Sequence, residues 1–148
     1  MKNCNSSFNN TMPMLLIWCI ISITPILSFA EFTPIIEGEI DVGNRSKSVS
    51  HILNFNVDKV SEEAKLEVQF KVKTAGSCPN TYESTTFFLN GDNFAELDFR
   101  KYELGEDKKV VLDIPEETLV VGKNKLEIIT GECKFGVDSM TLQSISVQ

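Results

Sequence analysis

The most regular feature of the sequence is an alternation of apolar and polar side chains over short runs. From Ala64 to Val72 every second residue is apolar, and the residues between them are charged or polar. Side chains of a β-strand point alternately to the two faces of a sheet, so this period of two predicts a strand with one buried face and one solvated face. An α-helix would need apolar residues three and four apart, and this run does not have that spacing.

The same period recurs along the chain and predicts about eight short strands. Asn90-Gly91 and Val121-Gly122-Lys123-Asn124 are typical of turns between strands. The sequence has no long helical pattern and no internal repeat, which favours an all-β sandwich or barrel. The runs that we interpret as strands are residues 36–42, 49–57, 64–72, 85–89, 95–99, 110–114, 126–130 and 140–147.

The last of these strands changes its alternation part-way along. Met140 and Leu142 are in phase with each other, whereas Ile145 and Val147 follow the opposite phase. A shift of one residue turns all later side chains to the other face of a sheet, and a β-bulge inserts one residue into a strand. The pattern therefore predicts a bulge near Gln143-Ser144.

The first thirty residues do not share this pattern. They carry one charge, and an apolar run over residues 14–27 ends at Ser28-Phe29-Ala30. A basic start, an apolar run and small residues at the cleavage positions are typical of a secretory signal peptide. The alternative is a membrane anchor, which needs about 20 apolar residues, but Pro25 and several polar residues interrupt the run. We therefore predict a signal peptide over residues 1–30 and one β-sandwich domain over residues 31–148, in a protein that is secreted or periplasmic.

The charge balance argues against one class of partner. The chain has 14 basic and 21 acidic residues, and loss of Lys2 with the signal peptide takes its net charge from −7 to −8. Nucleic acids and anionic membrane surfaces are bound by basic patches. We therefore expect no nucleic-acid partner and no membrane insertion after cleavage.

Two of the four cysteines, Cys78 and Cys133, remain after cleavage of the predicted signal peptide. A single pair in an exported domain has one intramolecular connectivity, and oxidising compartments favour disulfides. Each cysteine lies in a predicted loop that adjoins a predicted strand. We therefore expect one disulfide, between Cys78 and Cys133.

Residues 85–148 contain a series of motifs in a fixed order. Phe87-Phe88-Leu89-Asn90-Gly91 is followed by a strand that ends in Ile114-Pro115, then by a run from Leu119 to Ile128 that includes Gly122 and Asn124, and then by a last strand that opens with Asp138. This order resembles the ending of galactose-binding-like, or carbohydrate-binding-module-like, β-sandwich domains. The resemblance implies a jelly-roll-like antiparallel β-sandwich.

The resemblance also implies a binding function. Sugar-binding modules stack sugar rings on aromatic side chains and bind the hydroxyl groups with polar ones. Residues 31–148 depart from many such modules because they contain no tryptophan. Loops on a rigid scaffold are where binding residues concentrate, so we expect a ligand at a loop end of the sandwich rather than on the middle of a sheet. The candidate ligand-binding residues are Tyr82, Asp92, Asn93, Phe94, Tyr102 and Phe135, although Phe94 and Phe135 could instead cover the ends of the core.

A structural calcium ion is a further implication of the resemblance. Related modules hold one between an acidic first strand and an aspartate that opens the last strand. Glu37 and Glu39 lie on one face of the first predicted strand, and Asp138 opens the last one. Calcium takes about six to eight oxygen ligands, and these three residues are the candidates for supplying them. The alternative is that the glutamates form a solvated strand face. We expect no other cofactor.

The sequence provides no recognisable catalytic centre. Its one histidine, His51, is in phase with the apolar residues of its strand, and no nucleophile-elbow or H-E-x-x-H motif is present. Glycosidases need two carboxyl groups across a cleft, whereas the adjacent acids here lie in predicted polar loops. We therefore predict a secreted, non-catalytic binding module for carbohydrate or another extracellular ligand, such as a protein.

An alternative function is a structural or protein-interaction domain of an envelope or secreted assembly. An exposed, unpaired edge strand with apolar residues would favour that alternative, whereas loop aromatics beside polar groups favour a carbohydrate ligand.

Overall fold

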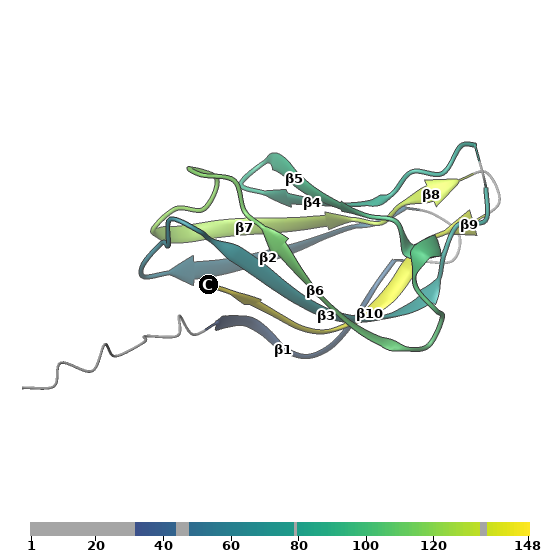
Figure 1. Cartoon of the computed structure of the whole chain (residues 1–148), viewed down its shortest axis with the longest axis horizontal. Coiled ribbons are helices and arrows are strands. Elements are labelled where there is room, and N and C mark those ends of the chain that lie inside the picture. Colours follow the sequence, from purple (N-terminus) through teal and green to yellow (C-terminus); the bar gives the residue numbers. More distant parts are fainter. Residues whose placement is uncertain (1–31, 44–47, 79, 134–135) are drawn as a thin grey trace, which may run out of the picture.

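In the computed structural model, the described part of the chain comprises residues 32–43, 48–78, 80–133 and 136–148 and consists mostly of β-strands (Figure 1). The predicted signal peptide lies outside these residues. None of the described helical segments has the length and hydrophobicity needed to cross a bilayer. The elements in chain order are β1 (Thr33–Val42), β2 (Ser50–Val57), β3 (Lys65–Thr74), β4 (Thr85–Leu89), β5 (Asp92–Leu97), the 3-10 helix η1 (Phe99–Lys101), β6 (Asp107–Asp113), β7 (Gly122–Ile129), β8 (Glu132–Cys133), β9 (Gly136–Val137) and β10 (Ser139–Val147).

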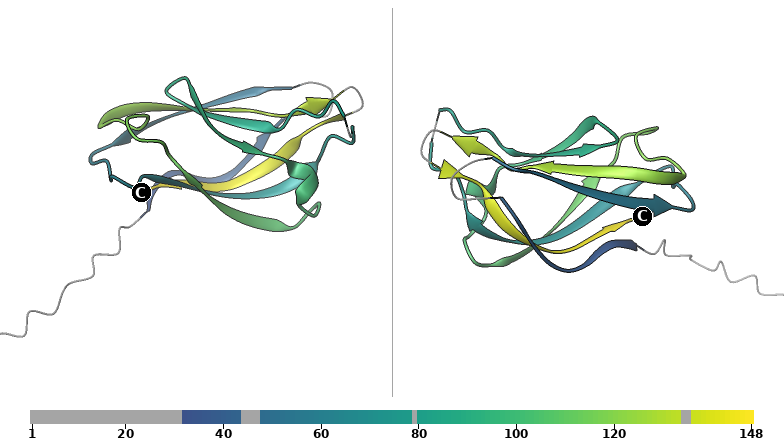
Figure 2. Two further views of the ribbon diagram at one scale, coloured as in Figure 1. Left: turned by 45° about the horizontal axis from the view of Figure 1, so that its top comes forward. Right: turned by 180° about the vertical axis from the view of Figure 1, so that it is seen from behind.

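Eight of these strands form two four-stranded sheets that lie face to face (Figures 1 and 2). One sheet, which we call the β3 sheet, has the order β1-β10-β3-β6, and the other, the β7 sheet, has the order β2-β7-β4-β5. All pairings in both sheets are antiparallel, and β8 and β9 form a short separate hairpin. Most connections cross from one sheet to the other, as in a jelly roll. The predicted jelly-roll-like antiparallel β-sandwich is therefore confirmed.

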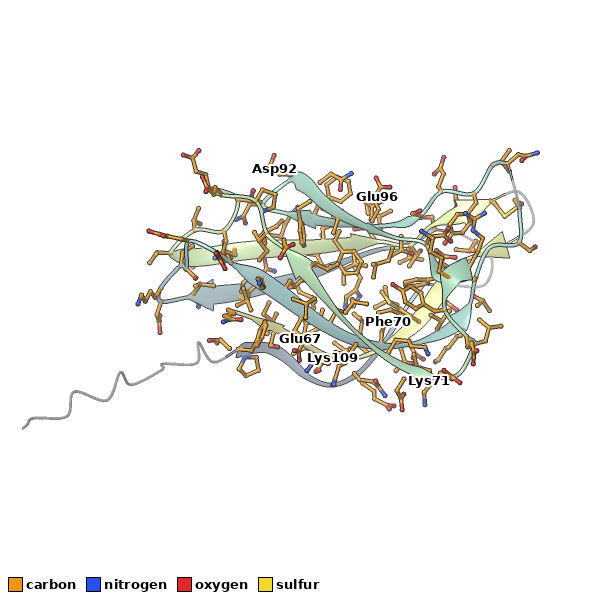
Figure 3. All side chains as sticks on the ribbon, viewed as in Figure 1. Glu67, Phe70, Lys71, Asp92, Glu96 and Lys109 are labelled. Atoms are coloured by element: carbon orange, nitrogen blue, oxygen red, sulfur yellow. A yellow bond between two sulfur atoms is a disulfide. The ribbon has the colours of Figure 1, made fainter. Side chains whose placement is uncertain are left out.

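β3 shows most clearly how the alternation of residue types forms the sandwich. The four apolar residues at every second position from Leu66 to Val72 are buried, while the residues between them lie on the outer face of the sheet. On that face Glu67 pairs with Lys109 at 2.7 Å and Lys71 pairs with Asp107 at 3.2 Å (Figure 3). Exposed ion pairs of this kind contribute little to stability, so burial of the apolar face is what holds the strand in place.

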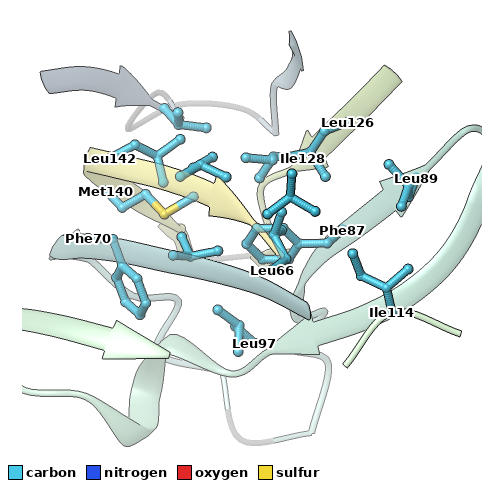
Figure 4. Packing of buried hydrophobic residues seen from close by; sticks show 14 of the residues in the cluster. Leu66, Phe70, Phe87, Leu89, Leu97, Ile114, Leu126, Ile128, Met140 and Leu142 are labelled. Carbon is cyan, nitrogen blue, oxygen red and sulfur yellow. The ribbon is translucent and has the colours of Figure 1, made fainter. Parts of the chain in front are cut away.

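The hydrophobic core fills the space between the two sheets. Its side chains come from both sheets, among them Leu66 and Phe70 of β3 and Phe87 of β4 (Figure 4). Phe99 of η1 is also fully buried, and its ring stacks on Phe70 with 5.4 Å between the ring centres. Tyr102 contacts Phe70 edge-on at the same centre-to-centre distance. The 3-10 helix therefore closes one end of the core.

The bulge predicted near Gln143-Ser144 is present in β10. The register of β10 against β3 shifts between Leu142 and Ser144, so Gln143 is the additional residue. Because of this shift, Leu142 and Ile145 are both fully buried although they differ in phase along the sequence.

One predicted strand begins and ends earlier in the chain than the sequence indicates. Residues 95–99 were expected to form a single strand, but β5 ends at Leu97 and Phe99 begins η1. Asp98 explains the change, because its side chain accepts a hydrogen bond from the backbone N–H of Arg100 and caps the 3-10 turn. The β8–β9 hairpin is a second difference, since it lies in a region that we predicted to be a loop.

Candidate functional site

Asp138 lies at the centre of a hydrogen-bonded network at one end of the sandwich. It is fully buried between β9 and β10. Its Oδ1 accepts a hydrogen bond from the backbone N–H of Gly76 at 3.0 Å. Its Oδ2 accepts hydrogen bonds from the hydroxyl groups of Tyr82 at 2.6 Å and Thr85 at 2.9 Å. One carboxylate therefore joins the start of β10 to the loop before β4 and to β4 itself.

Burial raises the pKa of Asp138 above its ordinary value, and the three donated hydrogen bonds oppose that rise. The same network requires a glycine nearby. The backbone N–H of Gly131 donates to the Thr85 hydroxyl at 3.0 Å. A Cβ atom on Gly131 would lie 2.7 Å from Oδ2 of Asp138, so any larger residue would have to displace the carboxylate.

Tyr82 is held by three contacts at this end of the molecule. Its hydroxyl donates to Asp138 and accepts a hydrogen bond from the backbone N–H of Phe99 at 3.1 Å. The guanidinium carbon of Arg100 lies 3.9 Å from the centre of the Tyr82 ring, which is a cation–π contact. Burial, together with the hydrogen bond to Asp138, raises the pKa of Tyr82 far above its ordinary value.

Arg100 connects this tyrosine to the disulfide. Two of its guanidinium nitrogens bind the carboxylate of Asp98, each at 2.8 Å, and these bonds hold the pKa of Asp98 below its ordinary value. A third nitrogen donates to the backbone carbonyl of Cys78 at 3.2 Å. The predicted disulfide between Cys78 and Cys133 is present, with 5.9 Å between the two Cα atoms. We call this part of the molecule the disulfide end.

An open hollow of about 370 Å³ lies beside this network. Thr86 pairs in register with Ile129 of β7 and with Glu96 of β5, so these three residues lie side by side across the sheet and form the floor. Glu96 projects away from the core (Figure 3). The remaining lining residues come from the segment before β2, the loop before β4 and the segment after β7, and they are Ser48, Tyr82, Glu83, Ser84, Thr130 and Gly131.

A larger hollow, of about 450 Å³, lies at the opposite end of the sandwich. Its lining includes the apolar residues Ala64, Ile114 and Leu119, with Glu116 and Glu117 beside them. It has no aromatic residue among its lining residues and one hydroxyl group, whereas the smaller hollow combines an aromatic residue with several hydroxyl groups. We therefore take the hollow at the disulfide end as the better candidate site for a polar ligand.

The structure does not bring the six candidate ligand-binding residues together. Tyr82 lines the hollow at the disulfide end, and Tyr102 packs against the core beside η1. Asp92, Asn93 and Phe94 begin β5 at the far end of the same sheet, where the Phe94 ring contacts Phe87 edge-on; Figure 3 shows Asp92 and Glu96 well apart along the strand. The sixth, Phe135, lies outside the described residues. The ligand role of all six stays a prediction.

Sequence reasoning missed the floor of the hollow. The floor residues take the outward positions of three predicted strands, and they are Thr86, Glu96 and Ile129. Alternation alone assigns such positions to solvent. Only the register between β4, β5 and β7 shows that these three residues are neighbours, and the sequence carries no signal for that register.

The described residues do not form the calcium site that the resemblance implies. Both oxygens of Asp138 already accept hydrogen bonds from protein donors. Glu39 lies in the middle of β1. Val42, three residues later, pairs with Met140, which is two residues from Asp138. The side chain of Glu37 is outside the described part. Within that part, no group of three or more histidine, cysteine, aspartate or glutamate residues is arranged to hold a metal ion.

No protein-family model and no curated protein matches this chain. Solved structures that are similar in fold include a family 35 carbohydrate-binding module from an environmental isolate, with 16% identity, coverage of 80% of this chain and 84% of that one, and a TM-score of 0.47. A family 36 carbohydrate-binding module in complex with calcium and xylotriose has 11% identity, coverage of 80% and 92%, and a TM-score of 0.41.

A third match is the structure of infectious bursal disease virus, Gx strain, with 17% identity, coverage of 79% of this chain and 30% of the viral one, and a TM-score of 0.41. At these identities and scores, the function has to be inferred from the chain's own residues.

Proposed function

We propose that this protein is an exported, non-catalytic binding module that recognises carbohydrate through the hollow at the disulfide end. The observation that carries the proposal is the chemistry of that hollow. It combines the aliphatic side chain of Ile129 and the ring of Tyr82 with the hydroxyl groups of Ser48 and Thr86 and the carboxylate of Glu96. A sugar presents C–H faces and hydroxyl groups together, and sites for such ligands pair apolar contacts with a few fixed polar groups.

The rigidity of the surrounding structure supports a binding role. Tyr82 is fixed by Asp138, Phe99 and Arg100, and Thr86 and Ile129 lie on paired strands. Groups that are already ordered lose little entropy when a ligand arrives. An open hollow lined by such ordered groups can therefore bind a sugar without the enclosure of a deep pocket.

Export is supported by two features that do not depend on the ligand. The disulfide between Cys78 and Cys133 is typical of proteins from oxidising compartments. Residues 1–30 have the charge and hydropathy pattern of a signal peptide.

The absence of catalysis is proposed from the carboxyl groups near the hollow. A glycosidase uses a pair of carboxyl groups across a cleft, one of which has a raised pKa. Asp138 has a raised pKa, but both of its oxygens accept hydrogen bonds from the protein. Glu83 and Glu96 line an open hollow and are themselves exposed to solvent, so they do not form a buried pair across a closed cleft.

A glycan array probed with the mature protein tests this proposal. We expect at least one glycan to bind, and we expect Glu96→Gln to weaken its binding about tenfold or more, because a hydrogen bond to a charged group contributes about 1.5–3 kcal/mol. The matched control is Asp92→Asn, which changes another exposed acid of the same strand at its other end.

The outcomes separate two candidate positions. Loss of binding in Asp92→Asn, with none in Glu96→Gln, would place the ligand at the opposite loop end, where Asn93 and Phe94 also lie. If no glycan binds, or if the protein hydrolyses one, the proposed function is wrong.

A further inference from the structure

β2 (Ser50–Val57) is an edge strand of the β7 sheet, and its free side is unprotected. β7 is its single neighbour in the sheet. The two strands pair over all eight residues of β2 without a register shift. In the view from behind, β2 runs along the outside of its sheet (Figure 2, right). A long, regular edge of this kind is a template on which another strand can pair.

The other three edge strands of the two four-stranded sheets carry features that oppose such pairing. β1 contains a proline, three acidic residues and irregular register against β10, and β5 contains two acidic residues and a register shift. β6 contains two aspartates and two lysines within seven residues. The sequence of β2, SHILNFNV, contains no aspartate, glutamate, lysine, arginine or proline. Charges, prolines and bulges are the usual means by which edges are protected, and β2 has none of them.

The free side of β2 presents the backbone of alternate residues. Val49 accepts a hydrogen bond from the N–H of Thr130 on the β7 side, and in an antiparallel pair the bonding direction alternates from residue to residue. The N–H and C=O groups directed to the free side are therefore those of Ser50, Ile52, Asn54 and Asn56. No backbone partner for them exists among the described residues.

We propose that two copies of this chain pair antiparallel through β2 about a two-fold axis, so that their β7 sheets join into one continuous eight-stranded sheet. The register that uses all four free residues is centred on Leu53. It sets Ile52 opposite Asn54 of the second copy and Ser50 opposite its Asn56. Closed two-fold association is the commonest form of homo-oligomer.

Charge explains why β2 is the edge on which a second copy can pair. The chain is acidic overall, and like charges that face each other across strands destabilise a sheet. Self-pairing through β1 or β5 would bring acidic residues together, whereas β2 contains no aspartate, glutamate, lysine or arginine. Pairing also covers Ile52, whose side chain is 51% exposed in the single copy.

Analytical ultracentrifugation of the mature protein over a range of concentrations tests the proposal. We expect a concentration-dependent dimer that Ile52→Lys weakens about 100-fold or more. Val111→Lys is the matched control, because Val111 is 50% exposed and also lies on an edge strand, β6, of the other sheet. Its association should equal that of the wild type.

Two further variants separate strand pairing from general loss of structure. Asn54→Pro removes an N–H that points to the free side and leaves the hydrogen bonds to β7 intact, so the chain should remain folded by circular dichroism but become monomeric. Adding Asn54→Asp to Ile52→Lys should restore association, because each new lysine would then face an aspartate of the second copy.

The proposal is overturned if the wild-type chain is monomeric at every concentration. This holds also if the monomer binds an extended peptide along β2. The proposal is equally overturned by a dimer that persists in Ile52→Lys and Asn54→Pro, or by one that Val111→Lys dissociates to the same degree as Ile52→Lys.

Discussion

Tyr82 and Asp138 show how predicted ligand contacts can also have a structural role. Tyr82 lies in a polar loop and lines the hollow, and in addition its hydroxyl binds Asp138 and its ring lies under Arg100. Asp138 opens the last strand and is a predicted calcium ligand, but its carboxylate receives three protein hydrogen bonds. Neither role could be predicted from the sequence, because the partners lie 17 to 62 residues away along the chain.

We expect Tyr82 to make the fold sensitive to alkaline pH. Its pKa is raised in the folded state, so the unfolded chain loses the phenolic proton first. The stability that depends on neutral Tyr82 is therefore fully present below its ordinary pKa of 10.0 and is lost as the pH rises towards the higher pKa of the folded state. Urea unfolding between about pH 8 and pH 11 should show a decline in the unfolding free energy that is smaller in Tyr82→Phe.

Tyr102→Phe is the control for this measurement, since the chain has two tyrosines. It should keep the pH dependence of the wild type. Identical pH profiles for the wild type and Tyr82→Phe would show that the Tyr82 hydroxyl does not couple proton binding to folding.

At the scale of elements, the sequence predicts what depends on local alternation. It predicts β3 because its period of two is unbroken, and it predicts the bulge in β10 because the phase changes between Leu142 and Ile145. It does not predict the β8–β9 hairpin or the end of β5. Those depend on the disulfide, on the network around Asp138 and on the cap that Asp98 forms, all of which are interactions that a strand pattern does not contain.

Deletion of Gln143 should leave Ile145 and Val147 on the core face, because Gln143 is the additional residue of the bulge. Without it, Leu142 and Ser144 become consecutive residues opposite Phe70 and Gln69, and the alternation continues regularly to Val147. The deletion variant should therefore keep most of the stability of the wild type. In Gln143→Ala the bulge remains and one exposed hydrogen bond to Asp107 is lost, so the change should stay within about 0.5 kcal/mol.

Urea denaturation of the two variants tests this expectation. A deletion variant that is far less stable than Gln143→Ala would mean that the bulge is needed for the packing of β10 between β1 and β3, and not only for the phase of its side chains.

At the scale of the whole molecule, the motifs that we identified in residues 85–148 help to maintain the fold. Asn90, in the Asn-Gly turn, donates to the carbonyl of Thr118 and to the side chain of Asn124. Asn124 is 3% exposed and also binds the backbone of Val120. These side chains fasten the end opposite the disulfide. The motifs therefore carry information about the fold, whereas the surfaces that we propose for function contain none of them.

The two proposed surfaces are compatible with each other. The hollow lies over β4, β5 and β7 and reaches Ser48, two residues before β2, whereas the proposed dimer forms along the free side of β2 itself. An antiparallel two-fold pairing of β2 would place both hollows on the same outer face of the continuous sheet. A dimer could then engage two sites on one polymeric glycan, and linked sites raise the effective affinity without any new contact.

Removal of the disulfide is expected to affect stability and the hollow together. The bridge joins residues that are 55 apart, so replacing both Cys78 and Cys133 by alanine should cost about 4 kcal/mol in the chain-entropy model. It also anchors the loop that carries Tyr82 and the segment after β7 that carries Gly131, and both line the hollow.

We therefore expect urea denaturation of the double variant to show lower stability and the glycan array to show weaker binding. Far-UV circular dichroism should still report the β-sandwich, because the core contacts of Phe70 and Phe87 remain. Reduction of the wild type with dithiothreitol should reproduce both effects. Unchanged stability in the double variant would mean that the hydrogen bonds of Asp138 hold this end without the covalent link.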